Sequence, residues 1–130
     1  MNTKITALHQ NFWNQLTPLL PNSNNIKTQL MSSSFELIYK KMMLTAMTEN
    51  ESDTAEIREI RNELENILKS EASVSERFTE LLKIIDGKSQ KIQTQLNYQA
   101  VEVYTAVLTS VEHLIPEEKY LSMRKTLDNF

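Results

Sequence analysis

The feature that most limits the folds open to this chain is its single glycine, Gly87, among 130 residues. Sheet proteins rely on glycine in hairpin turns and at bulges, where the backbone often takes positive φ values. Only three prolines are present, so tight reversals have few places to form. The sequence therefore predicts an all-α protein of long helices joined by polar loops.

Apolar residues recur at spacings of three and four along the chain, as they do in helices with a buried face. Pro18 lies inside the first such pattern, so we expect the first helix to end near Leu16 or to kink there. The predicted helices cover residues 3–20, 26–47, 53–68, 73–86, 89–114 and 116–130.

Several polar residues mark the ends of these helices. The segments Asp53–Glu56 and Ser73–Glu76 each match a capping box, in which the first and fourth residues satisfy each other's backbone N–H groups. Gly87 stands where a glycine after a helix C-terminus belongs. Pro116 is expected at the first position of the last helix, because a proline there loses no hydrogen bond.

The predicted helix over residues 89–114 is the most apolar and carries two apolar rows. The first row is Ile92, Leu96, Ala100, Val103, Val107 and Leu114, and the second is Tyr98, Val101, Thr105, Leu108 and Ile115. A helix that is apolar over most of its circumference is a buried one. We expect one compact bundle of five to six helices, a single domain over residues 1–130, with this helix at its centre.

The predicted second helix is also broad in its apolar pattern. One row is Ile26, Leu30, Leu37 and Leu44, and the row beside it is Met31, Phe35, Ile38 and Met42. A stripe of this width indicates contacts with two neighbouring helices.

The residues that most catalytic and metal sites need are scarce. The chain has no cysteine, which excludes disulfides, thiolate zinc sites and cysteine nucleophiles. Its two histidines, His9 and His113, belong to no Glu-x-x-His or His-x-x-x-His motif, and one glycine cannot build a phosphate-binding loop. We predict a protein that is not an enzyme and holds neither a metal nor a cofactor. Haem bound through His113 is kept as an alternative.

Charge and hydropathy limit the partners. The net charge is −3, and residues 49–86 alone carry eleven acidic and five basic side chains, which argues against nucleic-acid binding. The sequence also lacks a secretory leader and an apolar run long enough to cross a membrane. We therefore expect a cytoplasmic protein whose acidic stretch faces solvent or attracts a basic partner.

Five apolar or aromatic residues fall outside the main rows and are the predicted partner-binding residues: Trp13, Tyr39, Met43, Met47 and Tyr104. Tryptophan and tyrosine are common anchors of interfaces, and methionine adapts to varied partner surfaces. The segment 39–47 is expected to form one wall of a groove for a partner helix. The alternative is that the bundle buries these side chains in its own core.

In its helical pattern the chain resembles small bacterial and phage-encoded helical regulators, such as secretion chaperones, toxin-immunity proteins and inhibitors. A more distant resemblance is to globin-like sensor domains. The first resemblance implies a regulatory module that binds another protein, including a second copy of itself as a homodimer. The second implies a sensor that binds haem or an apolar small molecule.

Overall fold

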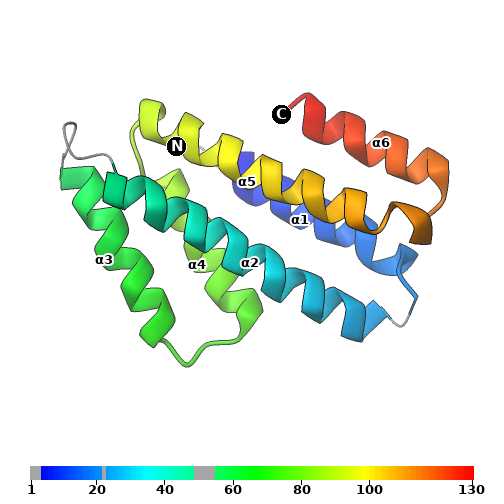
Figure 1. The fold of residues 1–130 in the computed structure, drawn as a ribbon, viewed down its shortest axis with the longest axis horizontal. Coiled ribbons are helices and arrows are strands. Elements are labelled where there is room, and N and C mark those ends of the chain that lie inside the picture. Colours follow the sequence, from blue (N-terminus) through cyan, green and yellow to red (C-terminus); the bar gives the residue numbers. More distant parts are fainter. Residues whose placement is uncertain (1–3, 22, 49–54) are drawn as a thin grey trace.

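The computed structural model describes residues 4–21, 23–48 and 55–130, which form six α-helices and two short 3-10 helices without any strand (Figure 1). The predicted all-α bundle is confirmed. The α-helices are α1 (Lys4–Leu16), α2 (Ser23–Thr48), α3 (Ala55–Lys69), α4 (Val74–Asp86), α5 (Gln90–Ser110) and α6 (Glu117–Asp128). The 3-10 helices are η1 (Thr17–Leu19) and η2 (Glu112–Leu114).

The helices pack in two layers, with α2, α5 and α6 in front of α1 and α4 in the view of Figure 1. Helix α3 packs at one edge, against α2 and α4. Two polar contacts join α2 to α5. Lys41 Nζ lies 3.8 Å from Glu102 Oε1, and Gln99 Nε2 donates to Thr45 Oγ1 at 2.8 Å. Because residue numbers rise along one helix as they fall along the other, α2 and α5 are antiparallel.

The two prolines that follow helices shape their ends. Helix α1 ends at Leu16 and continues as the 3-10 turn that contains Pro18, which is one of the two predicted alternatives. Helix α5 ends at Ser110, so the prediction that it runs to residue 114 was wrong. Val111 caps α5 with φ −111° and ψ 12°, outside the α-helical values, and η2 follows it. Ile115 is then extended with φ −124° and ψ 158°, as the residue before a proline prefers.

The capping predictions have mixed outcomes. The box at Ser73 is confirmed, with Ser73 Oγ accepting from the Glu76 N–H at 3.2 Å and Glu76 Oε1 accepting from the Ser73 N–H at 3.1 Å. Gly87 is the C-cap of α4, but its φ of −85° is not left-handed, so no special backbone conformation requires glycine there. Pro116 is the N-cap of α6, one position before the predicted one. The Asp53 box lies outside the described residues.

An aromatic cluster at the meeting of four helices forms the centre of the core. Phe12 from α1 and Phe78 from α4 lie with ring centroids 5.0 Å and 6.3 Å from that of Tyr104 on α5, and Phe35 from α2 lies 5.9 Å from Phe78. Val103, which precedes Tyr104 on α5, is buried as predicted. Burying large rings of this kind contributes much of the stability of a small bundle.

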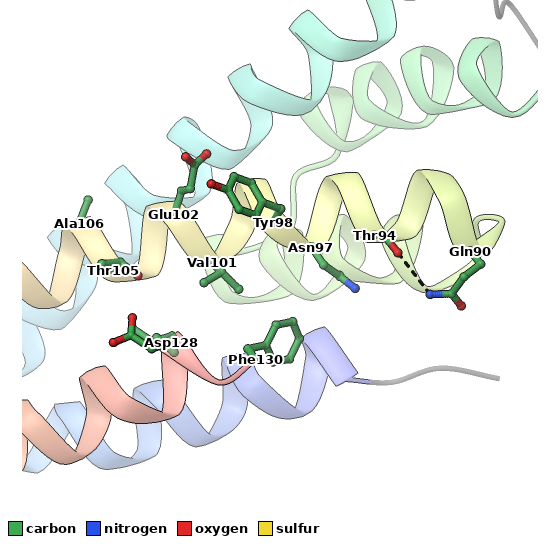
Figure 2. A pocket seen from close by; sticks show the side chains of 11 residues that line it. Gln90, Thr94, Asn97, Tyr98, Val101, Glu102, Thr105, Ala106, Asp128 and Phe130 are labelled. Carbon is green, nitrogen blue, oxygen red and sulfur yellow. Dashed lines mark hydrogen bonds between the residues drawn. The ribbon is translucent and has the colours of Figure 1, made fainter.

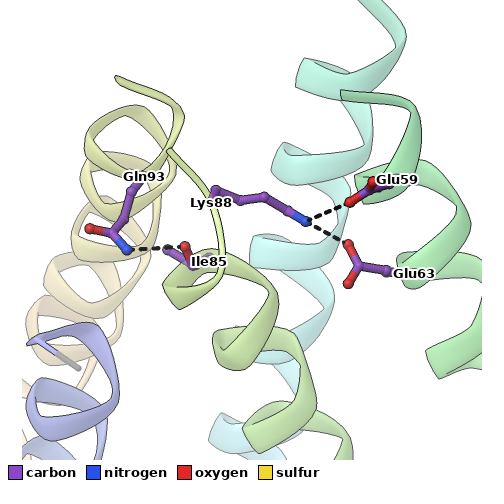
Figure 3. A network of polar contacts seen from close by, with 5 residues as sticks. All are labelled: Glu59, Glu63, Ile85, Lys88 and Gln93. Carbon is purple, nitrogen blue, oxygen red and sulfur yellow. Dashed lines mark hydrogen bonds and ion pairs between the residues drawn. The ribbon is translucent and has the colours of Figure 1, made fainter. Parts of the chain in front are cut away.

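The link between α4 and α5 is held to α3 by a lysine (Figure 3). The side chain of Lys88 is buried, and its Nζ lies 2.8 Å from Glu63 Oε1 and 3.8 Å from Glu59 Oε2. On the other side of the link, Gln93 Nε2 donates to the backbone oxygen of Ile85 at 3.3 Å. These contacts satisfy polar groups that the short connection would otherwise leave buried without partners.

Candidate functional site

Two of the five predicted partner-binding residues lie in the core. Trp13 and Tyr104 are both buried, so the expectation that they are exposed to a partner was wrong. The helical patterns placed them off the main apolar rows. They are buried because α1 and α5 each contact more than one neighbour, so a second side of each helix is covered. Trp13 Nε1 has no hydrogen-bond partner among the described residues.

The buried histidine has a structural role in the same cluster. A hydrogen bond of 2.6 Å joins His9 Nδ1 to the Tyr104 hydroxyl, and the His9 ring centroid lies 4.4 Å from that of Phe78. Burial, with a smaller effect from the cation of Lys27, lowers the pKa of His9 from 6.5 to about 4. Burial also raises the pKa of Tyr104 well above its usual value. His9 is therefore neutral at pH 7 and already occupied by Tyr104.

The second histidine, His113, lies on the exposed turn η2. His113 lines an open hollow of about 570 Å³ between the end of α5 and the start of α6, together with Glu112, Glu117 and Leu121. Among the residues that the structure describes, no group of three or more His, Cys, Asp or Glu side chains gathers as a metal site would require.

The remaining predicted residues are on α2 and are exposed to different extents. Tyr39 and Met43 are half-buried and pack against the core. Burial, together with the nearby Glu65, raises the pKa of the Tyr39 hydroxyl. Met47 is exposed at 59%. The segment 39–47 thus contributes a partly open surface, with Met42 buried beneath it.

An exposed apolar row on α2 was missed by the sequence prediction. Leu37 and Leu44 were expected in a buried row, but their exposed fractions are 46% and 63%. With Met47 they follow one another at spacings of seven and three residues, so all three lie on the same side of the helix. We call Leu37, Leu44 and Met47 the α2 row. The sequence shows two adjacent apolar rows on this helix but does not reveal which one is buried. In the structure, the row with Ile38 and Met42 faces the core.

A groove lies beside α5, where α6 ends (Figure 2). It has a volume of about 690 Å³. We call it the α5/α6 groove. Its lining residues are Gln90, Thr94, Asn97, Tyr98, Val101, Glu102, Thr105 and Ala106 from α5 and Leu127, Asp128 and Phe130 from the C-terminal segment.

The α5/α6 groove combines apolar, aromatic and acidic groups. Tyr98, predicted in a buried row, is exposed at 68% on one rim, and Phe130 lies on the opposite side (Figure 2). The charged lining residues, Glu102 and Asp128, are both acidic. Each has a basic neighbour, Lys41 at 3.8 Å from Glu102 and Arg124 at 3.3 Å from Asp128, and both carboxylates are largely exposed.

Comparisons with known proteins give no further guide. No family model, curated protein or solved structure matches the chain. Within the described residues no helix is both long and apolar enough to cross a bilayer. The candidate site is therefore defined by the geometry of this chain alone, as the α2 row and the α5/α6 groove.

Proposed function

We propose that this protein is a non-catalytic regulatory module that binds another protein through the α2 row. The supporting observation is the exposure of Leu37, Leu44 and Met47, at 46%, 63% and 59%, on one side of a single helix. Single exposed apolar residues are normal on protein surfaces. Three in succession at spacings of seven and three are the arrangement by which one helix packs along another.

A second copy of the chain is the first partner to consider. One patch serves twice under two-fold symmetry, so a homodimer buries an exposed row without requiring a second gene product. A helix of a different protein is the other partner of the proposal. In either case the acidic stretch over residues 49–86 would attract basic surfaces and increase the association rate.

The test is the mass of the protein as a function of concentration, measured by sedimentation equilibrium. Leu37→Gln, Leu44→Gln and Met47→Gln are combined in one variant, because glutamine keeps the helix propensity and removes the apolar surface. We expect the dissociation constant of the parent's assembly to rise by at least about tenfold, from the loss of three buried apolar contacts.

A matched control combines Leu68→Gln on α3 with Leu121→Gln on α6. These leucines have similar exposed fractions, 52% and 56%, but do not belong to the α2 row. The control should assemble like the parent. If the parent is monomeric, affinity capture from the native cell replaces the mass measurement. A row variant that then captures the same proteins as the parent would refute the proposal.

The second candidate function, a sensor of a small apolar molecule, is favoured by one observation. The α5/α6 groove has a volume of about 690 Å³, within the usual range for small-molecule sites. For haem the arrangement is less suitable, because His9 is bonded to Tyr104 and His113 lines a different hollow. A visible absorption spectrum of the purified protein with added haemin tests the haem version.

A cytoplasmic location, without nucleic acid or membrane as partner, belongs to the same proposal. It rests on the absence of cysteine, which suits a reducing compartment, and on the net charge of −3.

A further inference from the structure

Part of α5 extends beyond its neighbour α6. Helix α5 has 21 residues and α6 has 12, which correspond to lengths of about 32 Å and about 18 Å. The two helices pack against each other and are joined by the η2 turn, and Leu127 near the end of α6 lines the α5/α6 groove together with Val101. The N-terminal part of α5 beyond Val101 is therefore without α6 on that side (Figure 1).

The lining of this space favours a ligand that is both apolar and basic. Val101 and Leu127 offer apolar surface, and Tyr98 and Phe130 add two aromatic rings to the lining. Aromatic faces attract the cations of lysine and arginine, whose long stems also pack on apolar surface. Glu102 and Asp128 supply the opposite charge, and no lysine, arginine or histidine lines the groove.

The polar lining contains a further acceptor. Asn97 Oδ1 is buried and has no hydrogen-bond partner within the described part of the chain. The Asn97 side chain points from α5 toward the C-terminal segment in Figure 2. A buried amide oxygen without a donor costs free energy, which a donor from a bound segment would recover.

The α2 row has the complementary chemistry. Lys40 lies between Leu37 and Leu44 on the same exposed side of α2, so the row is apolar with a cation at its middle. The present partner of Lys40 is Glu36, at 3.4 Å, and both side chains are 69% exposed. An exposed pair of this kind contributes little, so Lys40 is free to exchange its partner at small cost.

The row and the groove open toward the same side of the molecule. On α2 the exposed row lies opposite the buried Ile38 and Met42, and on α5 the exposed Tyr98 and Glu102 lie opposite the buried Ala100. Helices α2 and α5 lie side by side in front of α1 and α4 (Figure 1). The buried Phe35 of α2 and Tyr104 of α5 contact Phe78 of α4, so the opposite, exposed sides of both helices face away from α4.

We infer that the occupant of the α5/α6 groove is the α2 row of a second copy of this chain. Leu37 and Leu44 of one copy lie against the apolar lining of the other, and Lys40 lies between Glu102 and Asp128. Because row and groove share one face, a two-fold axis lets each copy fill the groove of the other. The inference rests on the proposed binding role of the α2 row. It adds that the partner is a second copy of the chain and that the row binds in the α5/α6 groove of that copy.

Reversing charges on the two surfaces provides the test, with the dimer dissociation constant measured by sedimentation equilibrium at low salt. Lys40→Glu and Asp128→Lys should each weaken the dimer by about tenfold or more, since a two-fold dimer contains each affected contact twice. The double variant Lys40→Glu with Asp128→Lys should return to within about threefold of the parent, because the attraction is restored with its sign reversed.

The matched control is Lys83→Glu combined with Asp128→Lys. Lys83 is an exposed lysine on α4, and its only described ion pair is with Glu80 on the same helix. This control has the same net charge as the rescuing variant and should remain as weak as Asp128→Lys alone. If it recovers equally, general charge is responsible and the inference is overturned.

Two other results separate this inference from the proposed function. Suppose that the triple glutamine variant of the α2 row dissociates the dimer, but the double charge reversal does not restore it. The α2 row then binds a partner elsewhere than in the groove, and only the inference fails. A parent that stays monomeric at millimolar concentration overturns the inference as well, while binding of a different protein through the α2 row stands.

Discussion

At the scale of single residues, the most consequential side chain in the core is His9. Its hydrogen bond to Tyr104 and its contact with Phe78 tie α1 to α5 and α4 in one place. An imidazole surrounded by aromatic rings loses the hydration that its charged form needs. The core therefore tolerates His9 only while it is neutral.

This arrangement predicts that stability falls in mild acid. The folded state lowers the pKa of His9 from 6.5 to about 4, so the stabilisation is complete above pH 6.5 and is lost as the pH falls toward 4. The loss from this residue amounts to about 3 kcal/mol, because each pKa unit corresponds to about 1.4 kcal/mol. Urea unfolding at a series of pH values measures it.

His9→Gln should remove this part of the pH dependence, because glutamine can still bond to Tyr104 but does not titrate in this range. His113→Gln, on the exposed turn, serves as the control and should follow the parent. Equal slopes for the parent and His9→Gln between pH 6.5 and 4 would show that His9 is not the titrating group.

At the scale of elements, the link between α4 and α5 contains a buried cation, Lys88, that needs a carboxylate close to it. Glu63→Gln removes the carboxylate 2.8 Å from the buried Lys88 ammonium and leaves, among the described residues, the carboxylate of Glu59 at 3.8 Å. We expect a loss of about 1–2 kcal/mol in the free energy of unfolding, because a buried cation without its closest partner is costly.

Lys88→Met should be the milder change, with a loss below about 1 kcal/mol, since the apolar stem is kept and the two carboxylates are partly solvated. Chemical denaturation of the two variants and the parent provides the comparison. Glu80→Gln, which affects only the exposed pair with Lys83, should be neutral. A larger loss for Lys88→Met than for Glu63→Gln would contradict this account.

The elements themselves were largely predictable from the sequence, because they depend on local signals. The spacing of apolar residues gives all six helices, and the Ser73–Glu76 box gives the start of α4. The choice of face was less predictable. On α2 two apolar rows stand side by side, and only the tertiary arrangement decides that Ile38 is buried and Leu44 exposed.

At the scale of the whole molecule, the predictions of the candidate site failed where burial depends on how the helices pack together. Trp13 looked available because it lies beside the Phe12 row, and only the positions of α4 and α5 reveal that a second side of α1 is covered. The α5/α6 groove could not be predicted at all, since it arises from the unequal lengths of two helices that meet in space.

Substitutions of Trp13 consequently test the packing of the core and not the binding of a partner. Trp13→Ala should lower the free energy of unfolding by about 3–5 kcal/mol, as expected when a buried large ring is removed. Trp13→Phe should cost less, because it refills part of the cavity and removes an indole N–H that has no partner among the described residues. Thermal unfolding followed by circular dichroism gives both values, and a melting temperature for Trp13→Ala equal to the parent's would refute the core assignment.

The order of the helices along the chain has a consequence for synthesis. The partners of α1 come late: α4 begins at Val74, Tyr104 of α5 lies against Phe12, and Leu127 of α6 approaches Leu8. A ribosome that adds residues at ordinary speed makes α6 roughly 5 to 20 seconds after α1. Until α4 and α5 have been made, the side of α1 that they cover in the folded protein has no partner from these helices, and chaperones that meet nascent polypeptides can bind it.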